Sequence, residues 1–303
     1  EVTAARQTVD IHPYSTYIFR QNENANLANS WSGSAVVVSN NDQPIAGVAN
    51  FFNTGATKDT AQFHSYNAFS SGATKLYVPR IVRNYYDYQG GLKIQNVGDA
   101  DTDVTITFYL KGNTYPVNIA GLKPGQASGL YMPNVPELAG VDYASGAAII
   151  ESSGEPVIAT VNEDNRLGIA VPNNEGRGVT YNAIPDGAQT NTVLFPQFTS
   201  KYYGYCSGVQ VQNVGNDTTT VTAVFSMAGR SDVTVTADVA PMQSVSWFGP
   251  DIAGLGVDFN GSVVVSADQP LVGIANMSSR TDKETRYPTN YGDSFTTYNG
   301  INK

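Results

Sequence analysis

Few residues of this chain have the types and spacings that catalysis requires. A Ser/His/Asp arrangement needs a positioned imidazole to take the proton of the nucleophile, and only His12 and His64 are available. No Gly-x-Ser-x-Gly segment accompanies them, so we interpret both as surface or strand histidines. Zinc needs several thiolate or imidazole ligands, which Cys206 and two histidines do not supply. The sequence therefore predicts no enzymatic activity and no cofactor.

One loop carries carboxylates at a spacing that could suit Ca²⁺. Asp99, Asp101 and Asp103 alternate along the chain, so their side chains could converge on one ion. The equivalent loop further along, residues 215–218, lacks this charge. This difference favours a polar hairpin turn over a calcium site.

A glycosidase would need two carboxylates that face each other across a cleft. The candidates by residue type are Glu151, Glu155, Glu163 and Asp164. Their counterparts further along the chain are uncharged, so the sequence preserves no acid pair between its repeats. We interpret all four as solvated loop acids.

Tyrosines give a stronger binding signal than the titratable residues. Two Tyr-Tyr-x-Tyr blocks occupy residues 85–88 and 202–205, and in an extended strand alternate tyrosines would project from one face. Sugar rings stack on flat aromatic surfaces, subunit interfaces favour Tyr, and a packed core is the third reading. The candidates for an interface or a sugar site are Tyr85, Tyr86, Tyr88, Tyr202, Tyr203 and Tyr205.

Asparagines recur at fixed places. Asn50, Asn162 and Asn276 each follow a proline by six positions, and we predict that each ends a strand in a structural turn. Sequons for N-glycosylation begin at Asn216, Asn260 and Asn276, so glycan attachment at these sites is a further expectation.

The elements that would position these residues are repeated. A strand-like segment of the Gly-Ser-Val-Val-Val type and a following segment of the Pro-Ile-Ala-Gly-Val-Ala-Asn type occur three times, with a period of roughly 115 residues, the size of a β-sandwich domain. The segments are 33–38 with 44–50, 146–150 with 156–162, and 261–265 with 270–276. Between them lie short runs that alternate apolar and polar residues, as half-buried strands do. We predict an all-β fold of tandem antiparallel, immunoglobulin-like β-sandwiches.

The first copy of the repeat is incomplete. The predicted domains are an incomplete half sandwich at 1–75, a complete repeat at 76–192 and a complete repeat at 193–303. Within the half sandwich, 9–11 and 14–19 are predicted strands, but nothing matches residues 77–109 of the next copy. Three absent strands would remove on the order of nine buried apolar side chains, or about 15 kcal/mol, more than the net stability of a domain.

Three arrangements would satisfy such a half sandwich. Strands of a neighbouring subunit could complete it, the half sandwich could pack as an extra sheet on the next domain, or the chain could be cut from a longer polypeptide. The sequence favours the first arrangement and leaves the other two open.

Composition limits the partners and the location. The formal net charge is −9 and only 14% of residues are charged, so no basic surface is available for nucleic acid or anionic membranes. No apolar run approaches the ~20 residues needed to span a bilayer. The lone cysteine excludes an intrachain disulfide, and the polar, lysine-poor composition fits an extracellular or cell-surface protein whose signal has been removed.

The chain resembles the tandem immunoglobulin-like β-sandwich proteins of prokaryotic cell surfaces, which include surface-layer, adhesin and extracellular filament subunits. The resemblance rests on the Gln-Asn-Val-Gly blocks at 95–98 and 212–215 and on the Gly-Ser-Val-Val-Val segments. It implies a non-enzymatic structural subunit that assembles with copies of itself by strand complementation or sheet augmentation. The alternative is a carbohydrate-binding or adhesive module that uses the tyrosines, with glycans as partners.

Overall fold

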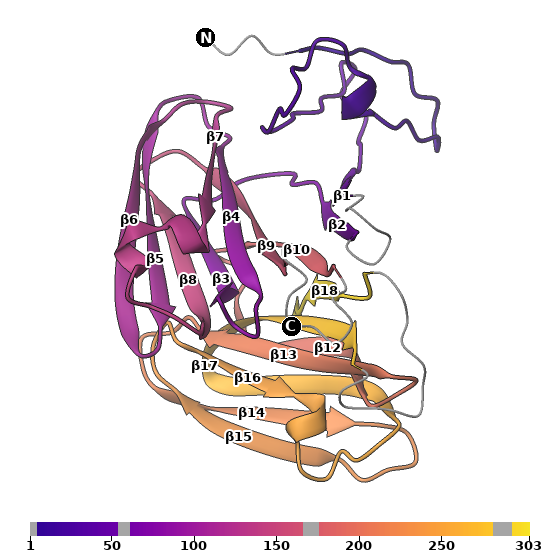
Figure 1. Cartoon of the computed structure of the whole chain (residues 1–303), viewed down its shortest axis with the longest axis vertical. Coiled ribbons are helices and arrows are strands. Elements are labelled where there is room, and N and C mark those ends of the chain that lie inside the picture. Colours follow the sequence, from indigo (N-terminus) through magenta and orange to yellow (C-terminus); the bar gives the residue numbers. More distant parts are fainter. Residues whose placement is uncertain (1–4, 54–60, 166–175, 281–292) are drawn as a thin grey trace. The chain divides into compact units, whose positions relative to one another are not determined.

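The computed structural model describes residues 5–53, 61–165, 176–280 and 293–303, and the regular structure in these ranges is almost entirely antiparallel β-strand. The prediction of an all-β sandwich fold is therefore confirmed. The chain divides into two compact units, residues 1–37 and residues 38–303 (Figure 1). The domain boundaries predicted at 75 and 192 stay a prediction. Within the described residues, no helix has the length and apolar character of a membrane-spanning segment.

Two antiparallel sheets form a β-sandwich, which we call sandwich A (Figure 1). One sheet has the order β10-β9-β4-β7 and the other the order β11-β3-β8-β5-β6. The bounds are β3 (Lys75–Arg83), β4 (Gln89–Asn96), β5 (Thr102–Leu110), β6 (Asn113–Leu122), β7 (Ala127–Tyr131), β8 (Ala144–Ser152), β9 (Val157–Asp164), β10 (Gly178–Asn182) and β11 (Ile184–Pro185).

Alternation along the strands builds the core of sandwich A. In β5, every second side chain points inward, and Ile106, Phe108 and Leu110 are completely buried. The inward residues of both sheets join in one hydrophobic cluster with Met132 and Leu138, which lie on two short 3₁₀ turns, Met132–Asn134 and Pro136–Leu138. These turns close one end of the sandwich.

The repeat that follows, sandwich B, has the same strand pairs with one difference. Its strands are β12 (Thr190–Ser200), β13 (Tyr205–Asn213), β14 (Thr219–Ser226), β15 (Val233–Val239), β16 (Ser244–Phe248), β17 (Phe259–Ser279), β18 (Thr296–Asn299) and β19 (Ile301–Asn302), with a 3₁₀ turn at Gly249–Asp251. The sequence predicted two strands joined by a polar turn at 261–276. Instead β17 runs through continuously and pairs with β12 and β14 and then with β13 and β18. The equivalent connection in sandwich A is one residue longer and contains Gly154, which permits a turn.

The segment before β3 contains a single hairpin, β1 (Val48–Asn53) with β2 (Gln62–Asn67). The strands predicted at 9–11, 14–19 and 33–38 are absent, since the described residues 5–47 form no strand and have only the 3₁₀ turn Gln21–Glu23. The physical reason is that no strand of the described residues lies beside them, because a strand needs a neighbouring strand for its backbone N–H and C=O groups. The counterpart of 33–38 in sandwich A is β8, which is held between β3 and β5.

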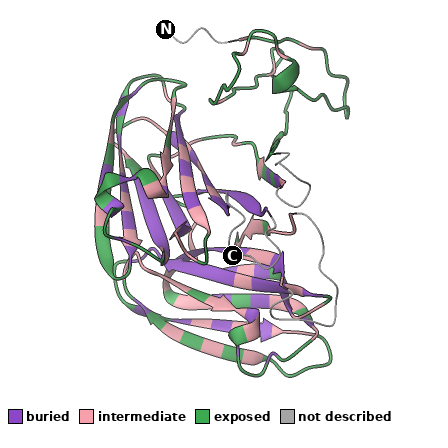
Figure 2. Ribbon diagram, in the orientation of Figure 1, coloured by how far each residue is buried: buried purple, intermediate pink, exposed green. Residues whose placement is uncertain are grey.

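Most of these strandless residues are solvent-exposed (Figure 2). Val36, Val37 and Val38 are 72%, 58% and 72% exposed, although they match a buried strand of sandwich A. The pattern that predicts a core strand is therefore present here without a core.

The two sandwiches are joined by a small apolar cluster, which we call the junction. Tyr77, Ile149 and Ile184 of sandwich A pack against Val214 and Val272 of sandwich B, and all five are buried. The hairpin β1–β2 lies against β10 of sandwich A, where the ring of His64 is 3.0 Å from the Thr180 hydroxyl. Residues 38–303 thus hold a hairpin and two sandwiches in one compact unit.

Candidate functional site

Each Tyr-Tyr-x-Tyr block forms a tight turn, so the prediction of an extended strand with tyrosines on one face is wrong. Tyr85 and Tyr88 exchange backbone hydrogen bonds of 3.0 and 3.1 Å, and the 202–205 block closes in the same way. Between them, Tyr86 and Asp87 have φ of 50° and 63°. A two-residue hairpin loop with positive φ at both central residues is the type I′ turn, which matches the twist of the flanking strands.

Both turns hold a tyrosine in the left-handed region, where bulky side chains are rare. Tyr86 and Tyr203 have φ of 50° and 48°, and they are 63% and 58% exposed. Backbone strain of this kind costs on the order of 1–3 kcal/mol and concentrates at functional sites. The two tips are thus the best placed tyrosines for an external contact.

In sandwich A, a buried ion pair lies beside the turn. The Arg80 guanidinium donates two hydrogen bonds to the Glu163 carboxylate, at 2.7 and 2.6 Å, and a third to Gln210 of sandwich B at 3.0 Å. Its guanidinium carbon lies 5.8 Å from the centroid of the Tyr85 ring. Burial lowers the pKa of Arg80, but the charge and hydrogen bonds of Glu163, together with Tyr85 and Tyr181, raise it above its ordinary value, so the arginine is charged.

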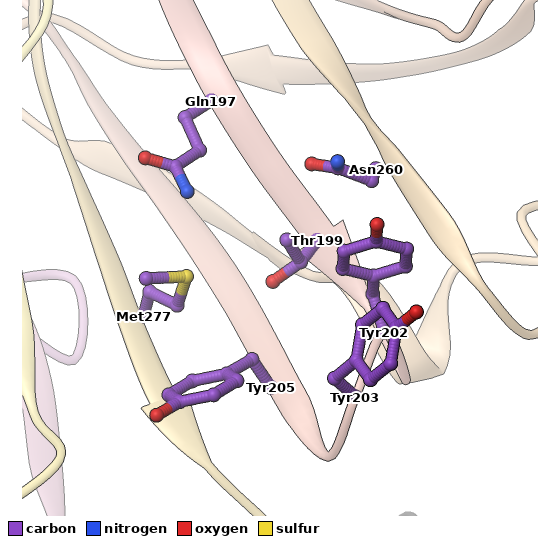
Figure 3. Close-up of a pocket in the computed structure, with 7 residues that line it drawn as sticks. All are labelled: Gln197, Thr199, Tyr202, Tyr203, Tyr205, Asn260 and Met277. Atoms are coloured by element: carbon purple, nitrogen blue, oxygen red, sulfur yellow. The ribbon is translucent and has the colours of Figure 1, made fainter.

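In sandwich B, the same place is a hollow of about 280 Å³. Gln197 and Met277 occupy the positions that Arg80 and Glu163 have in sandwich A, and because both are uncharged they form no ion pair with each other. Figure 3 shows Tyr205 and Met277 on one side of the hollow and Tyr202 and Asn260 on the other. The full lining is Gln197, Thr199, Tyr202, Tyr203, Tyr205, Asn260 and Met277. Flat rings around a small, uncharged hollow suit an aromatic side chain or a sugar ring.

Tyrosines of the first block also contact aromatic residues elsewhere in the protein. Tyr86 contacts Tyr85 and Tyr143 at centroid distances of 4.8 and 5.4 Å, so three tyrosines cluster on sandwich A. Tyr88 packs edge-on against Phe295 of sandwich B at 5.2 Å. Burial raises the pKa of Tyr88 to about 12, so its hydroxyl is neutral at ordinary pH.

The repeated asparagines lie within strands, so the prediction that they form turns is wrong. Each is paired across a hairpin with a hydroxyl residue: Asn50 with Ser65, Asn162 with Thr180, and Asn276 with Thr297. In the first two pairs the hydroxyl donates a 2.8 Å hydrogen bond to the Asn side chain. The recurrence therefore comes from a cross-strand pair, which a sequence alone does not distinguish from a turn.

A second set of asparagines connects the three hairpins to one another. The side-chain amide of Asn182 donates a 2.9 Å hydrogen bond to the backbone carbonyl of Asn67. Asn299, one repeat later, donates an identical 2.9 Å bond to the carbonyl of Asn182. The hairpins of successive copies are thus stacked by one repeated contact.

Asp293, which no sequence pattern marks, forms hydrogen bonds with residues of all three copies. Its carboxylate accepts hydrogen bonds from the backbone N–H groups of Phe63, Gly178 and Phe295, at 2.9, 3.0 and 3.0 Å. Burial raises the pKa of Asp293 to about 6, and the three N–H donors oppose that effect only in part. No motif marks this residue in the sequence, because its partners are backbone groups of two other copies.

The raised pKa of Asp293 predicts a pH-dependent stability. A raised folded-state pKa means that the stabilisation is fully present below pH 3.8 and is lost as the pH rises through about 6. Because Asp293 is only half-buried, solvent weakens the effect, and we expect a loss of only about 1–2 kcal/mol between pH 4 and pH 7. Urea unfolding at both pH values, compared with Asp293→Asn, measures it. An equal difference between the two proteins at both pH values would contradict the expectation.

The other candidates for chemistry do not converge. Asp99 and Asp101 are exposed in the turn before β5 and Asp103 is exposed within β5, and within the described residues no three His, Cys, Asp or Glu side chains form a metal-binding group. Asp103 accepts a 2.7 Å hydrogen bond from the Gly121 N–H. His12 is exposed, while His64 is buried in β2 and stacks on Phe51 at 4.5 Å.

The structure also shows the burial of two candidate acids and of the three sequon asparagines. Glu163 and Asp164 are buried in β9, so the prediction of solvated loop acids is wrong for both; Glu163 is held by Arg80, a pairing between strands far apart in sequence. Of the sequons, Asn216 and Asn260 are exposed, and Asn276 is half-buried within β17. Glycosylation at these residues stays a prediction.

The fold and the repeated contacts define an all-β protein built from antiparallel sandwiches. No family model and no curated protein matches the chain. Among solved structures, the Thermotoga maritima protein 1070 is 14% identical, with a TM-score of 0.31, over 38% of this chain and 95% of that chain. A partial N-terminal region of an enterococcal surface protein is 7% identical, with a TM-score of 0.19, over 90% and 100%. A calcium-binding mutant of β-glucuronidase 2 from Bacteroides uniformis is 12% identical, with a TM-score of 0.15, over 84% and 32%. Similarities with TM-scores this low carry no inference about this chain.

Proposed function

We propose that this protein is a non-enzymatic structural subunit of an extracellular filament or surface array, in which strands of one subunit complete the half sandwich of another. The observation that carries the proposal is the state of residues 33–38. They have the sequence of a core strand and match β8, yet in the single chain they are exposed and form no strand. Strand addition from a partner would supply both the backbone hydrogen bonds and the apolar cover.

The hairpin β1–β2 supports the same proposal. Its counterpart in sandwich A is the pair β9–β10, and there β9 also pairs with β4 on its other edge. In the part of the chain that the structure describes, β1 pairs with β2 alone. Phe52 and Val48 on this hairpin are 70% and 60% exposed. An open, apolar strand edge is the feature that sheet augmentation uses.

Adding charge to the exposed strand tests the proposal. In the double variant Val36→Asp/Val37→Asp, we expect polymers to be lost in electron micrographs and in sedimentation, because buried, unpaired carboxylates are strongly unfavourable in a completed sandwich. The thermal unfolding of the single chain should not change, since both valines are exposed. The control Asn40→Asp/Asn41→Asp adds the same charge at nearby exposed residues and should assemble like the wild type. A wild-type chain that stays monomeric at all concentrations would contradict the proposal.

A further inference from the structure

Sandwich B has an apolar surface equivalent to the one that sandwich A uses in the junction. Tyr77, Ile149 and Ile184 of sandwich A are only 3–5% exposed because sandwich B covers them. Their counterparts on sandwich B are Leu194, Val264 and Ile301. Leu194 is half-buried, and Val264 and Ile301 are 38% and 56% exposed. Sandwich B thus carries the counterpart of this junction surface, and two of its three apolar residues are exposed in the part of the chain that the structure describes.

The stacking of the hairpins indicates which element of a second chain would pack on this surface. The Asn182 side chain contacts the hairpin of the copy before it, and the Asn299 side chain does the same one repeat later. Asn67 has the equivalent position on β2, and it is exposed. Continuing the series places the Asn67 amide of a second chain on the Asn299 carbonyl of the first.

An aromatic pair follows the same series. Where sandwich A meets sandwich B, Tyr88 of the turn packs on Phe295 of β18's hairpin. One repeat later the tyrosine is Tyr205, which lines the hollow, and the equivalent phenylalanine on β2 is Phe63, which is 51% exposed. Both members of a second Tyr–Phe pair are therefore present in the chain, at opposite ends of its series of hairpins.

The third hairpin of the series, in sandwich A, has no phenylalanine at the equivalent position. In β10, the residue equivalent to Phe63 and Phe295 is Gly178, and the hairpin that it faces is β1–β2. A Cβ at Gly178 would lie 2.3 Å from the Nε2 atom of His64, so no side chain fits. Phe295 faces sandwich A, which carries a Tyr-Tyr-x-Tyr turn, and Phe63 would face the equivalent turn in sandwich B of another copy. Gly178 faces the hairpin β1–β2, which carries no such turn.

We propose that the hairpin β1–β2 of a second copy of this chain docks on sandwich B beside β17 and β18. Phe63 of the second copy enters the hollow against Tyr205, and its Asn67 donates to the carbonyl of Asn299. The inference rests on the proposed assembly and deepens it by naming the contact. Because the two surfaces differ, the contact is heterologous and leaves an open end on every added subunit, which is the symmetry of a filament.

Cross-linking between two single-cysteine chains tests the contact. In a Cys206→Ser background, one chain carries Phe63→Cys and the other Tyr205→Cys, and a short bismaleimide is added after they are mixed under assembly conditions. We expect a covalent dimer from the mixture and none from either chain alone. The control pairs Tyr205→Cys with Asn113→Cys, the exposed first residue of β6, and should give no dimer.

A second variant keeps the test informative if the cysteine chains fold poorly. Phe63→Asp should raise the concentration needed for assembly by about tenfold or more, because a buried aromatic anchor is lost. Normal filaments from Phe63→Asp, together with no cross-link, would overturn this contact and leave the proposed function standing. If the wild type forms no polymer, the proposed function fails as well. A hollow that binds an added oligosaccharide while copies do not cross-link would assign it to a glycan and would also overturn the inference.

Discussion

Replacing Glu163 by methionine is expected to lower the free energy of unfolding by about 3–5 kcal/mol, because it leaves the Arg80 guanidinium buried without its counter-ion. The side chains of Arg80 and Glu163 are only 14% and 6% exposed, so water does not replace the lost partner. Arg80→Gln should lower the free energy of unfolding by a similar amount, since it leaves the Glu163 carboxylate buried without its counter-ion. Urea unfolding of the purified chain measures both changes.

Sandwich B supplies the matched control for this pair. It has Gln197 and Met277 at the equivalent positions and remains folded without a charge there. The double variant Arg80→Gln/Glu163→Met should therefore lie within about 1–2 kcal/mol of the wild type, well above either single variant. Additive losses in the double variant would show that each side chain contributes through packing and that the ion pair is not the cause.

Truncation of Phe225 to alanine is expected to destabilise sandwich B by about 3–5 kcal/mol. Phe225 is completely buried in the core of sandwich B, and its ring meets that of Phe198 edge-on at 4.9 Å, so the substitution leaves a cavity between two sheets. Differential scanning calorimetry should show the transition of sandwich B at a lower temperature.

The adjacent residue is the control for Phe225. Val224 lies on the other face of β14 and is only half-buried. Val224→Ala should cost about 1 kcal/mol, since fewer carbon atoms leave a packed environment. Equal losses for Val224→Ala and Phe225→Ala would contradict the assignment of the inward face.

The sequence predicts most of the fold because alternation and repetition are local signals. The alternating residues of β5 and β14, and the recurrence of the proline-led strands, are sufficient to predict antiparallel sheets in tandem. The continuous strand β17 is an exception, since a single missing residue and the absence of a glycine convert a turn into extended chain. The strandless residues 5–47 are another, because local pattern predicts a strand wherever it occurs and contains no information on whether a partner is present.

The candidate surface is less predictable because its contacts join distant residues. The tyrosine blocks are visible in the sequence, but their turn geometry is not. The turns depend on Asp87 and Gly204 as the second central residues, which accept a positive φ. The ion pair of Arg80 with Glu163 connects two strands whose proximity only the fold determines. Asp293 bonds to backbone groups, which carry no sequence signal at all.

The continuity of β17 has a mechanical consequence. The strand pairs with β12 and β14 along one half and with β13 and β18 along the other, so one continuous strand joins them all into a single eight-stranded sheet. A pulling force transmitted along β17 must shear several rows of backbone hydrogen bonds at once, whereas in sandwich A the turn at residues 153–156 separates β8 from β9. Under load, sandwich A is expected to extend first and act as the compliant element, while sandwich B stays rigid.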